Sequence, residues 1–193
     1  MKVLRLAAML TAPAFLCAAC VSDGTQQREY ALPDTLCGLI DDQDLYAPFF
    51  PPGEEVWVDD SSVAIGAEGT TWIEGSCSLS VDHEYILVIQ VAPVRQVEQE
   101  LGGFLTEDLD PEAAEEVTDS PIVSKVWPHA AIAHTDCAPP SRDGDYEVYG
   151  IDVLINAEFQ ADEDFSEELA RLINPVAQAW FDLLPDRYSS CVP

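Results

Sequence analysis

The stretch TWIEGSCSLSVDHEYILVIQVAPV, residues 71–94, decides the fold. From Thr71 to Asp82, apolar or small residues alternate with polar ones, which is the pattern of an antiparallel strand with one face on a core and the other toward solvent. That alternation places Cys77 inward. The second half, EYILVIQVAPV, is apolar on both faces at its centre, which predicts a central strand covered on both sides and ended by Pro93.

Further strands are predicted on both sides of this stretch. VWV at 56–58 and VAIGA at 63–67 flank the polar DDSS and are expected to form a hairpin. Residues 130–137 and 146–159 are predicted as two more strands, joined by the turn-rich PPSRDGD. Alternate residues of the second strand are apolar and give it one face for a core: Tyr149, Ile151, Val153, Ile155 and Ala157.

Short helices are predicted between the strands. Asp34 can cap a helix carrying Leu36, Leu39 and Ile40. Residues 96–105 form a second short helix that breaks at the two glycines 102–103. Asp110 followed by Pro111 is a cap-then-first-turn signature for a third helix, PEAAEEV, at 111–117.

The last element is a long helix. Asp164 and Glu167 form a start that resembles a capping box, and Pro175 is expected to kink or divide the helix near Asn174. Apolar residues recur at helical spacing along it: Phe165, Leu169, Leu172, Ile173, Val176, Ala177, Trp180, Leu183 and Leu184. This order of elements predicts an α+β fold, in which an antiparallel sheet carries short helices and the long C-terminal helix.

The N-terminus has the pattern of a secretory signal peptide. Lys2 and Arg5 precede an uncharged apolar stretch, Leu6 to Ala19, which is shorter than the ~20 residues that span a bilayer. The sequence then reads FLCAAC at 15–20. A C-x-x-C of this kind lacks both the strand–helix context of a redox motif and the further ligands of a zinc site.

Small side chains point to cleavage before Cys20, because that bond has Ala18 and Ala19 on its N-terminal side, whereas cleavage before Cys17 would place two bulky residues there. The stretch LCAAC resembles a bacterial lipobox, and this resemblance implies a diacylglycerol on the thiol of Cys20. Secretion without a lipid, after cleavage at the same bond, is the alternative. We therefore expect a signal peptide at 1–19, a lipid-anchored flexible tether at 20–33 and one domain at 34–193.

Four cysteines remain after the leader and the anchor: Cys37, Cys77, Cys137 and Cys191. An even number in an exported chain indicates two disulfides, for which three connectivities exist. The pairs Cys37–Cys77 and Cys137–Cys191 are favoured, because each then joins a helix or terminus to a strand within its own half of the chain.

The chain is strongly acidic. Its formal net charge is −28, and loss of Lys2 and Arg5 with the leader removes two of the eight basic residues and none of the 36 acidic ones, which leaves −30. Such a charge repels nucleic acids and anionic membrane surfaces. It is compatible with basic protein partners, cationic ligands or divalent ions, and equally with a role in solubility alone.

Few residues indicate catalysis or metal binding. His134, Asp136 and Cys137 would be two ligands short once Cys137 is in a disulfide, so His134 is expected to be a surface histidine near a strand end. DGDYE, from Asp143, resembles part of a calcium loop but is better explained by a hairpin turn. We predict no metal and no cofactor.

Adjacent carboxylates leave a hydrolase open as the alternative function. The acid pairs Asp41-Asp42, Asp59-Asp60 and Glu115-Glu116 could serve glycoside hydrolysis if two carboxyl groups faced each other at the right spacing. In a chain with 36 acidic residues, however, such pairs occur by chance. No recognised nucleophile elbow, zinc-protease helix or phosphate loop accompanies them.

Trp57 and Trp72 are candidates for a partner surface. Trp72 falls on the polar face of its strand, and Trp57 lies near the Pro51-Pro52 turn. Exposed aromatic residues beside acids would suit a basic or carbohydrate-like partner, and burial under a helix is the alternative.

The whole mature chain resembles the small cell-envelope lipoproteins of actinobacteria. The resemblance rests on LCG at 36–38, a central cysteine on a strand, Cys137-Ala138-Pro139 at the end of another strand and a C-terminal helix that ends in a cysteine. It implies an extracytoplasmic, lipid-anchored location and disulfides, and no active site. We therefore expect a non-enzymatic lipoprotein that binds a protein or small ligand, with a mainly structural or stress-related surface protein as a further possibility.

Overall fold

The structure is a computed structural model of the whole chain, and it describes residues 28–59, 75–94, 109–118, 120, 122–143, 146–157, 163–184 and 186–191. In this part of the chain, seven strands form one antiparallel sheet in the order β1-β2-β3-β7-β6-β5-β4. The strands are β1 Val56–Asp59, β2 Gly75–Val81, β3 Glu84–Val94, β4 Glu115–Val117, β5 Val123–Val126, β6 Ala130–Asp143 and β7 Tyr146–Asn156. The α-helices are α1 Gln43–Tyr46 and α2 Ser166–Asp182, and the 3-10 helices are η1 Ala47–Phe49, η3 Pro111–Ala113 and η5 Asp186–Cys191.

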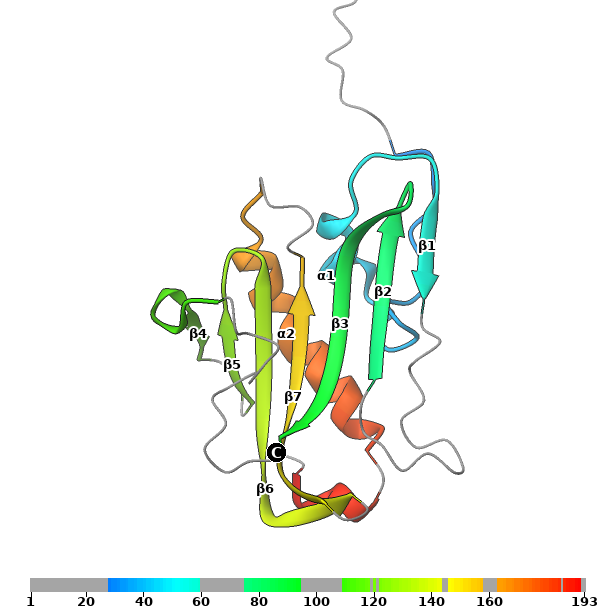
Figure 1. Cartoon of the computed structure of the whole chain (residues 1–193). Coiled ribbons are helices and arrows are strands. Elements are labelled where there is room, and N and C mark those ends of the chain that lie inside the picture. The colour runs from blue at the N-terminus through cyan, green and yellow to red at the C-terminus, as the bar shows by residue number, and fades with distance from the viewer. Residues whose placement is uncertain are drawn as a thin grey trace, which may run out of the picture.

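The predicted antiparallel sheet with a long C-terminal helix on it is confirmed. Figure 1 shows α2 crossing behind the central strands, with α1 near its first turns. The predicted apolar stripe of α2 is buried except at its end, because Leu183 follows the helix and is 43% exposed. The residues of the stripe that are buried against the sheet are Leu169, Leu172, Ile173, Val176, Ala177 and Trp180. Each fully buried Leu or Ile contributes roughly 1.5–3 kcal/mol, so this interface supplies much of the core. None of the described helices is long and apolar enough to cross a membrane.

The β2–β3 hairpin follows the predicted alternation. Cys77, Leu79 and Val81 are buried on the α2 side of β2, while the serines between them are partly exposed on the other side. Asp82 and His83 form the connecting turn with φ values of 51° and 71°. Two successive positive φ values are typical of a type I′ turn, whose twist suits a two-residue hairpin.

β3 is a central strand, as predicted, because it pairs with β2 on one side and β7 on the other. Leu87, Ile89 and Val91 are fully buried toward α2. The opposite face is only partly covered, since Val88 and Gln90 have intermediate exposure. Pro93 lies inside the strand, which ends one residue later at Val94.

Both predicted disulfides are present. Cys37 is bonded to Cys77 in β2, and Cys137 in β6 is bonded to Cys191 at the end of η5. All four residues are buried. The first disulfide fixes the N-terminal segment to the sheet, and the second fixes the C-terminus to it.

The predicted helix after Asp34 is wrong. Leu36 and Ile40 instead form a β-bridge around a tight turn, in which Cys37 and Gly38 have φ values of 56° and 70°. Such left-handed backbone cannot continue a right-handed helix. The first helix is α1, and Asp42 caps it by accepting a hydrogen bond from the N–H of Asp44 at 3.1 Å.

The end of the predicted tether contacts the domain. Nη2 of Arg28 donates to the carbonyl oxygens of Ala47 and Phe50, and the hydroxyl of Tyr30 donates to the carbonyl oxygen of Pro51. In the described part of the chain, contacts with the domain therefore begin at Arg28, within the predicted tether.

Three other predictions need correction. Residues 111–117 form η3 and then β4 rather than one helix, although Asp110 caps the turn as predicted. Residues 139–143 of the predicted turn belong to β6, whose register shifts between Asp136 and Ser141. Finally, α2 runs through Pro175 without being divided, so the predicted division is wrong, while the alternative of a kink stays a prediction.

Two predicted elements and two predicted site residues lie outside the described residues. They are the strand at 63–67, the helix at 96–105, Trp72 and Cys20. In the described part of the chain, β1 pairs with β2. β5, which pairs with β6, was not predicted.

Candidate functional site

The face of the sheet that points away from α2 carries exposed aromatic residues at the β1 corner. The register pairs Trp57 of β1 with Ser80 of β2, and Ser80 in turn with Tyr85 of β3. A small serine therefore lies between two large rings on three adjacent strands. Trp57 is 51% exposed and Tyr85 is 52% exposed, so both rings are accessible at the surface.

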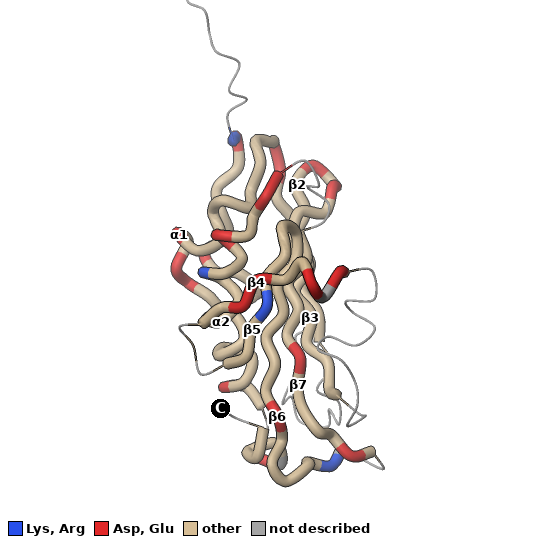
Figure 2. Tube along the Cα trace, turned by 90° about the vertical axis from the view of Figure 1, so that its left-hand side faces the viewer, with Lys and Arg blue, Asp and Glu red and all other residues tan. Residues whose placement is uncertain are grey.

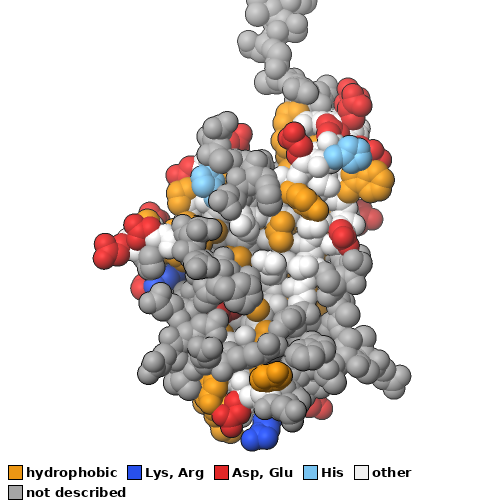
Figure 3. Space-filling view, viewed as in Figure 1, with side chains coloured by type: hydrophobic (Ala, Val, Ile, Leu, Met, Phe, Trp, Pro, Cys, Tyr) orange, Lys and Arg blue, Asp and Glu red, His pale blue; other side chains and the backbone are white. Residues whose placement is uncertain are grey.

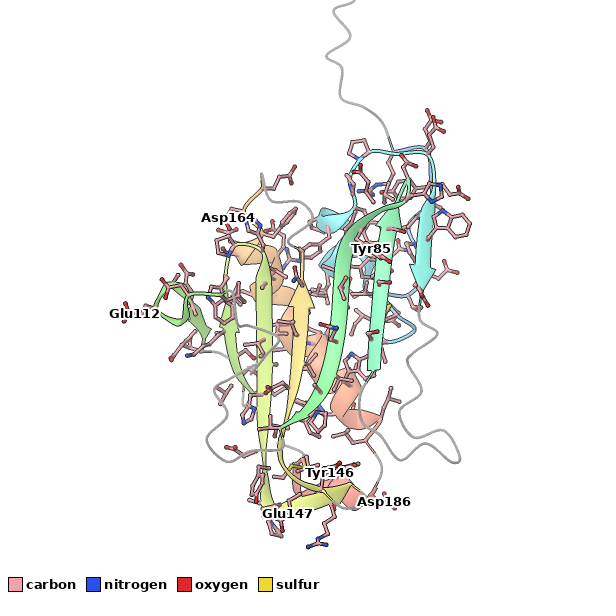
Figure 4. All side chains as sticks on the ribbon, in the orientation of Figure 1. Tyr85, Glu112, Tyr146, Glu147, Asp164 and Asp186 are labelled. Carbon is pink, nitrogen blue, oxygen red and sulfur yellow. A yellow bond between two sulfur atoms is a disulfide. The ribbon has the colours of Figure 1, made fainter. Side chains whose placement is uncertain are left out.

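These residues line a surface recess of about 460 Å³, which we call the aromatic recess. Its walls and floor include Trp57, Asp59, Ser78, Ser80, His83 and Tyr85. Figure 4 shows Tyr85 on the β2 side of β3, and Figure 3 shows this corner of the molecule, where hydrophobic side chains and a histidine lie among acidic ones. The recess combines two aromatic rings with hydroxyl groups and a carboxylate.

The hairpin turn positions one wall of the aromatic recess. His83 stacks on Trp57 with ring centroids 6.1 Å apart and an angle of 30° between the ring planes. Asp82, the other turn residue, accepts hydrogen bonds from the N–H groups of Glu54 and Glu55 at 3.0 and 2.9 Å. Because these bonds join the turn to the segment that enters β1, the indole and the imidazole are held in one unit.

The aromatic recess lies in an acidic part of the surface. Asp59 lines it directly, while Asp82 and Glu84 line a separate, smaller recess that shares Tyr85 with it. Neither lining contains a lysine or an arginine among the described residues. Figure 2 shows how few basic positions the described chain carries. Carboxylates attract cations and repel anions.

His134 is not the surface histidine that the sequence predicts. It lies in the middle of β6, where its side chain is 19% exposed. Its Nδ1 is 2.6 Å from Oδ1 of the buried Asp152 on β7, and its Nε2 is 3.1 Å from Oδ1 of Asp136. Burial alone would lower the pKa of His134, but the hydrogen bonds and charges of both carboxylates outweigh it and raise the pKa above 6.5.

Gly150 makes room for this histidine. A Cβ atom at position 150 would lie 2.6 Å from Cε1 of His134 and 2.8 Å from the backbone oxygen of Thr135. The glycine and the imidazole therefore fit together across β6 and β7. Both ring nitrogens of His134 face carboxylates rather than open space, and the described residues contain no group of three or more potential ligands arranged to hold a metal ion.

The acid pair on β4 does not place its two carboxyl groups face to face. Glu115 and Glu116 are neighbours on β4, so their side chains point to opposite faces of the sheet. Asp42 is engaged as the cap of α1. Asp60, the partner of Asp59, lies outside the described residues, as do Gly144 and Asp145 of the predicted calcium-like turn.

Sequence reasoning found Trp57 but missed Tyr85 and His83. The pattern EYILVIQV indicated where the strand begins, but not that a register shift between Leu79 and Ser80 turns Tyr85 onto the same face as Ser80. The signal that could have identified both residues was the presence of aromatic side chains at the turn between two predicted strands. Comparison of the chain with protein-family models, curated proteins and solved structures found no significant match.

Proposed function

We propose that this protein is an extracytoplasmic lipoprotein, anchored through Cys20, whose disulfide-bonded domain binds a partner at the cell envelope through the aromatic recess. The signal-peptide pattern and the two disulfides support an exported protein. If Cys20 carries no lipid, the same domain is secreted.

The observation that carries the binding function is the pair of half-exposed rings on either side of Ser80. Large aromatic side chains usually dominate the energetics of interfaces when they become buried there. Here Trp57 and Tyr85 each leave about half of their surface in water. A partner that covers both rings would gain hydrophobic and stacking energy without any rearrangement of the sheet.

The test is crosslinking in intact envelopes. A photoreactive amino acid replaces Ser78, on the floor of the aromatic recess, and in a control protein it replaces Tyr146. Tyr146 is 53% exposed, as Tyr85 is, but it starts β7 at the other end of the sheet (Figure 4). We expect a crosslinked species from position 78 and none from position 146. Equal crosslinking at both positions, or none at position 78, would contradict a binding role of this recess.

A further inference from the structure

The aromatic recess leaves room for a flat group between its two exposed aromatic side chains. Trp57 and Tyr85 are two strand spacings apart, roughly 10 Å, and Ser80 between them is small. A planar group sandwiched between two rings needs roughly 3.5–4 Å on each side. The space above Ser80 is therefore wide enough for a planar group that contacts both side chains, with the serine hydroxyls below it and His83 stacked on Trp57 at one wall.

The chemistry of the walls selects a cation. The faces of aromatic rings are electron-rich and attract positive charge, most strongly in the case of tryptophan. Asp59 adds a carboxylate to the recess. An anionic ligand would be repelled by these groups. A neutral sugar would stack on the rings but would gain little from the negative charge around them.

Among cations, the guanidinium group fits best. It is planar, stacks on aromatic faces and presents several N–H donors in one plane, which match a carboxylate and hydroxyl acceptors. Asp59, Ser78 and Ser80 provide such acceptors along the recess. A lysine ammonium is a compact, strongly hydrated charge and cannot fill a flat slot in this way.

We propose that the aromatic recess binds the guanidinium group of an arginine on a basic protein partner. This inference rests on the proposed binding function and names its ligand. The strongly negative net charge draws basic protein surfaces toward the domain over a longer range, while stacking on Trp57 and Tyr85 selects arginine. The recess therefore recognises an arginine side chain exposed on the surface of a folded or extended partner.

The experiment is a titration of the full mature chain with small probes. Binding is monitored by NMR, through the chemical shift of the indole N–H of Trp57. The probes are N-acetyl-arginine amide, N-acetyl-lysine amide, the neutral N-acetyl-citrulline amide and a neutral chitin oligosaccharide. We expect saturable shifts with the arginine probe, binding weaker by about fivefold or more with lysine, and no saturation with citrulline. Similar binding of arginine and citrulline would overturn the role of charge.

Variants separate the contributions of the walls. Trp57→Ala is expected to abolish saturable binding of the arginine probe, followed at the backbone N–H groups of Ser78 and Ser80, and Asp59→Asn to weaken it by about threefold to tenfold. Tyr146→Ala, on an equally exposed tyrosine at the other end of the sheet, should bind like the parent chain. Unchanged binding in both recess variants would overturn the proposed site, provided that their spectra show the parent fold.

The outcomes distinguish this inference from the proposed function. If the oligosaccharide saturates and arginine does not, the recess binds a ligand but the guanidinium assignment is wrong. If arginine does not bind and envelope crosslinking at position 78 also fails, both proposals are wrong. If arginine binds and the crosslinked partner is joined to the recess next to one of its arginines, both are supported.

Discussion

Nδ1 of His134 lies 2.6 Å from Oδ1 of Asp152, so a buried carboxylate on β7 is bonded to a histidine on β6 in the middle of the sheet. The second nitrogen of the ring faces Asp136, which is exposed. Val123 is the register partner of His134 on β5, and it brings no charge to the cluster. The charged form of His134 is therefore held between two carboxylates.

This contact predicts a pH dependence of stability. The pKa of His134 is raised in the folded state, so folding favours the protonated histidine. Its contribution to the free energy of unfolding is complete below the unfolded value of 6.5 and is lost as the pH rises through the raised folded value. In His134→Asn, urea denaturation should show a stability gap to the parent chain that is largest at mildly acidic pH and narrows toward alkaline pH.

The control for this measurement is His83→Asn, which changes an exposed histidine in the β2–β3 turn and keeps a residue that tolerates positive φ. The difference in stability between His83→Asn and His134→Asn is expected to depend on pH in the same way as the difference between the parent chain and His134→Asn. A gap for His134→Asn that stays constant with pH would show that the protonated histidine does not stabilise the fold.

Gly150→Ala is predicted to destabilise the domain by about 2–4 kcal/mol. The new Cβ would meet the backbone oxygen of Thr135 at 2.8 Å as well as the ring of His134, and a backbone atom in a paired strand cannot move aside cheaply. Gly38→Ala is the comparison: it has φ of +70° but nothing within 4 Å of the added atom, so only the backbone penalty of about 1–2 kcal/mol applies. Thermal denaturation that ranks Gly38→Ala as the more damaging change would refute this account.

Each disulfide is predicted to stabilise the domain by up to about 4 kcal/mol, because the two bridges span 40 and 54 residues. Alanine at both Cys137 and Cys191 should also release η5 from β6, and hydrogen exchange should then rise first around Tyr188. The matched double variant at Cys37 and Cys77 should instead expose the segment before β1. If both double variants lose protection in the same region, the bridges do not act locally as the structure indicates.

The sequence pattern predicted the sheet best where burial is strongest. Cys77, Leu79 and Val81 alternate with serines in the sequence because one face of the strand packs on the core. In the structure, burial alternates along β2 in the same way. The pattern failed near Cys37 because a disulfide and two positive φ values, rather than helix propensity, set the local backbone there. Similarly, residues 115–117 form a strand because they pair with β5, a tertiary effect that outweighs the helix signature of Asp110.

The candidate site was predictable only in part, for a related reason. Trp57 stood out as a large aromatic residue next to acids, but its neighbours come from other strands. The shift in register between β2 and β3 decides which face Tyr85 occupies, and a positive φ at His83 places its ring on the indole. Neither feature leaves a periodic signal in a single sequence. The pairing of His134 with Asp152 likewise depends on the register of β6 and β7.

Lipid anchoring through Cys20 is tested by the intact mass of protein extracted from its native envelope, with thiols alkylated before and after reduction. We expect a chain that begins at Cys20 and carries acyl groups, in which four cysteines react only after reduction. Cys17→Ala should give the same mature mass, because position 17 belongs to the leader that is removed. Cys20→Ala should abolish acylation and release the domain from the membrane fraction. A parent chain without acyl groups, whose Cys20 thiol reacts before reduction, would mean that the protein is secreted and that the aromatic recess acts without a membrane anchor.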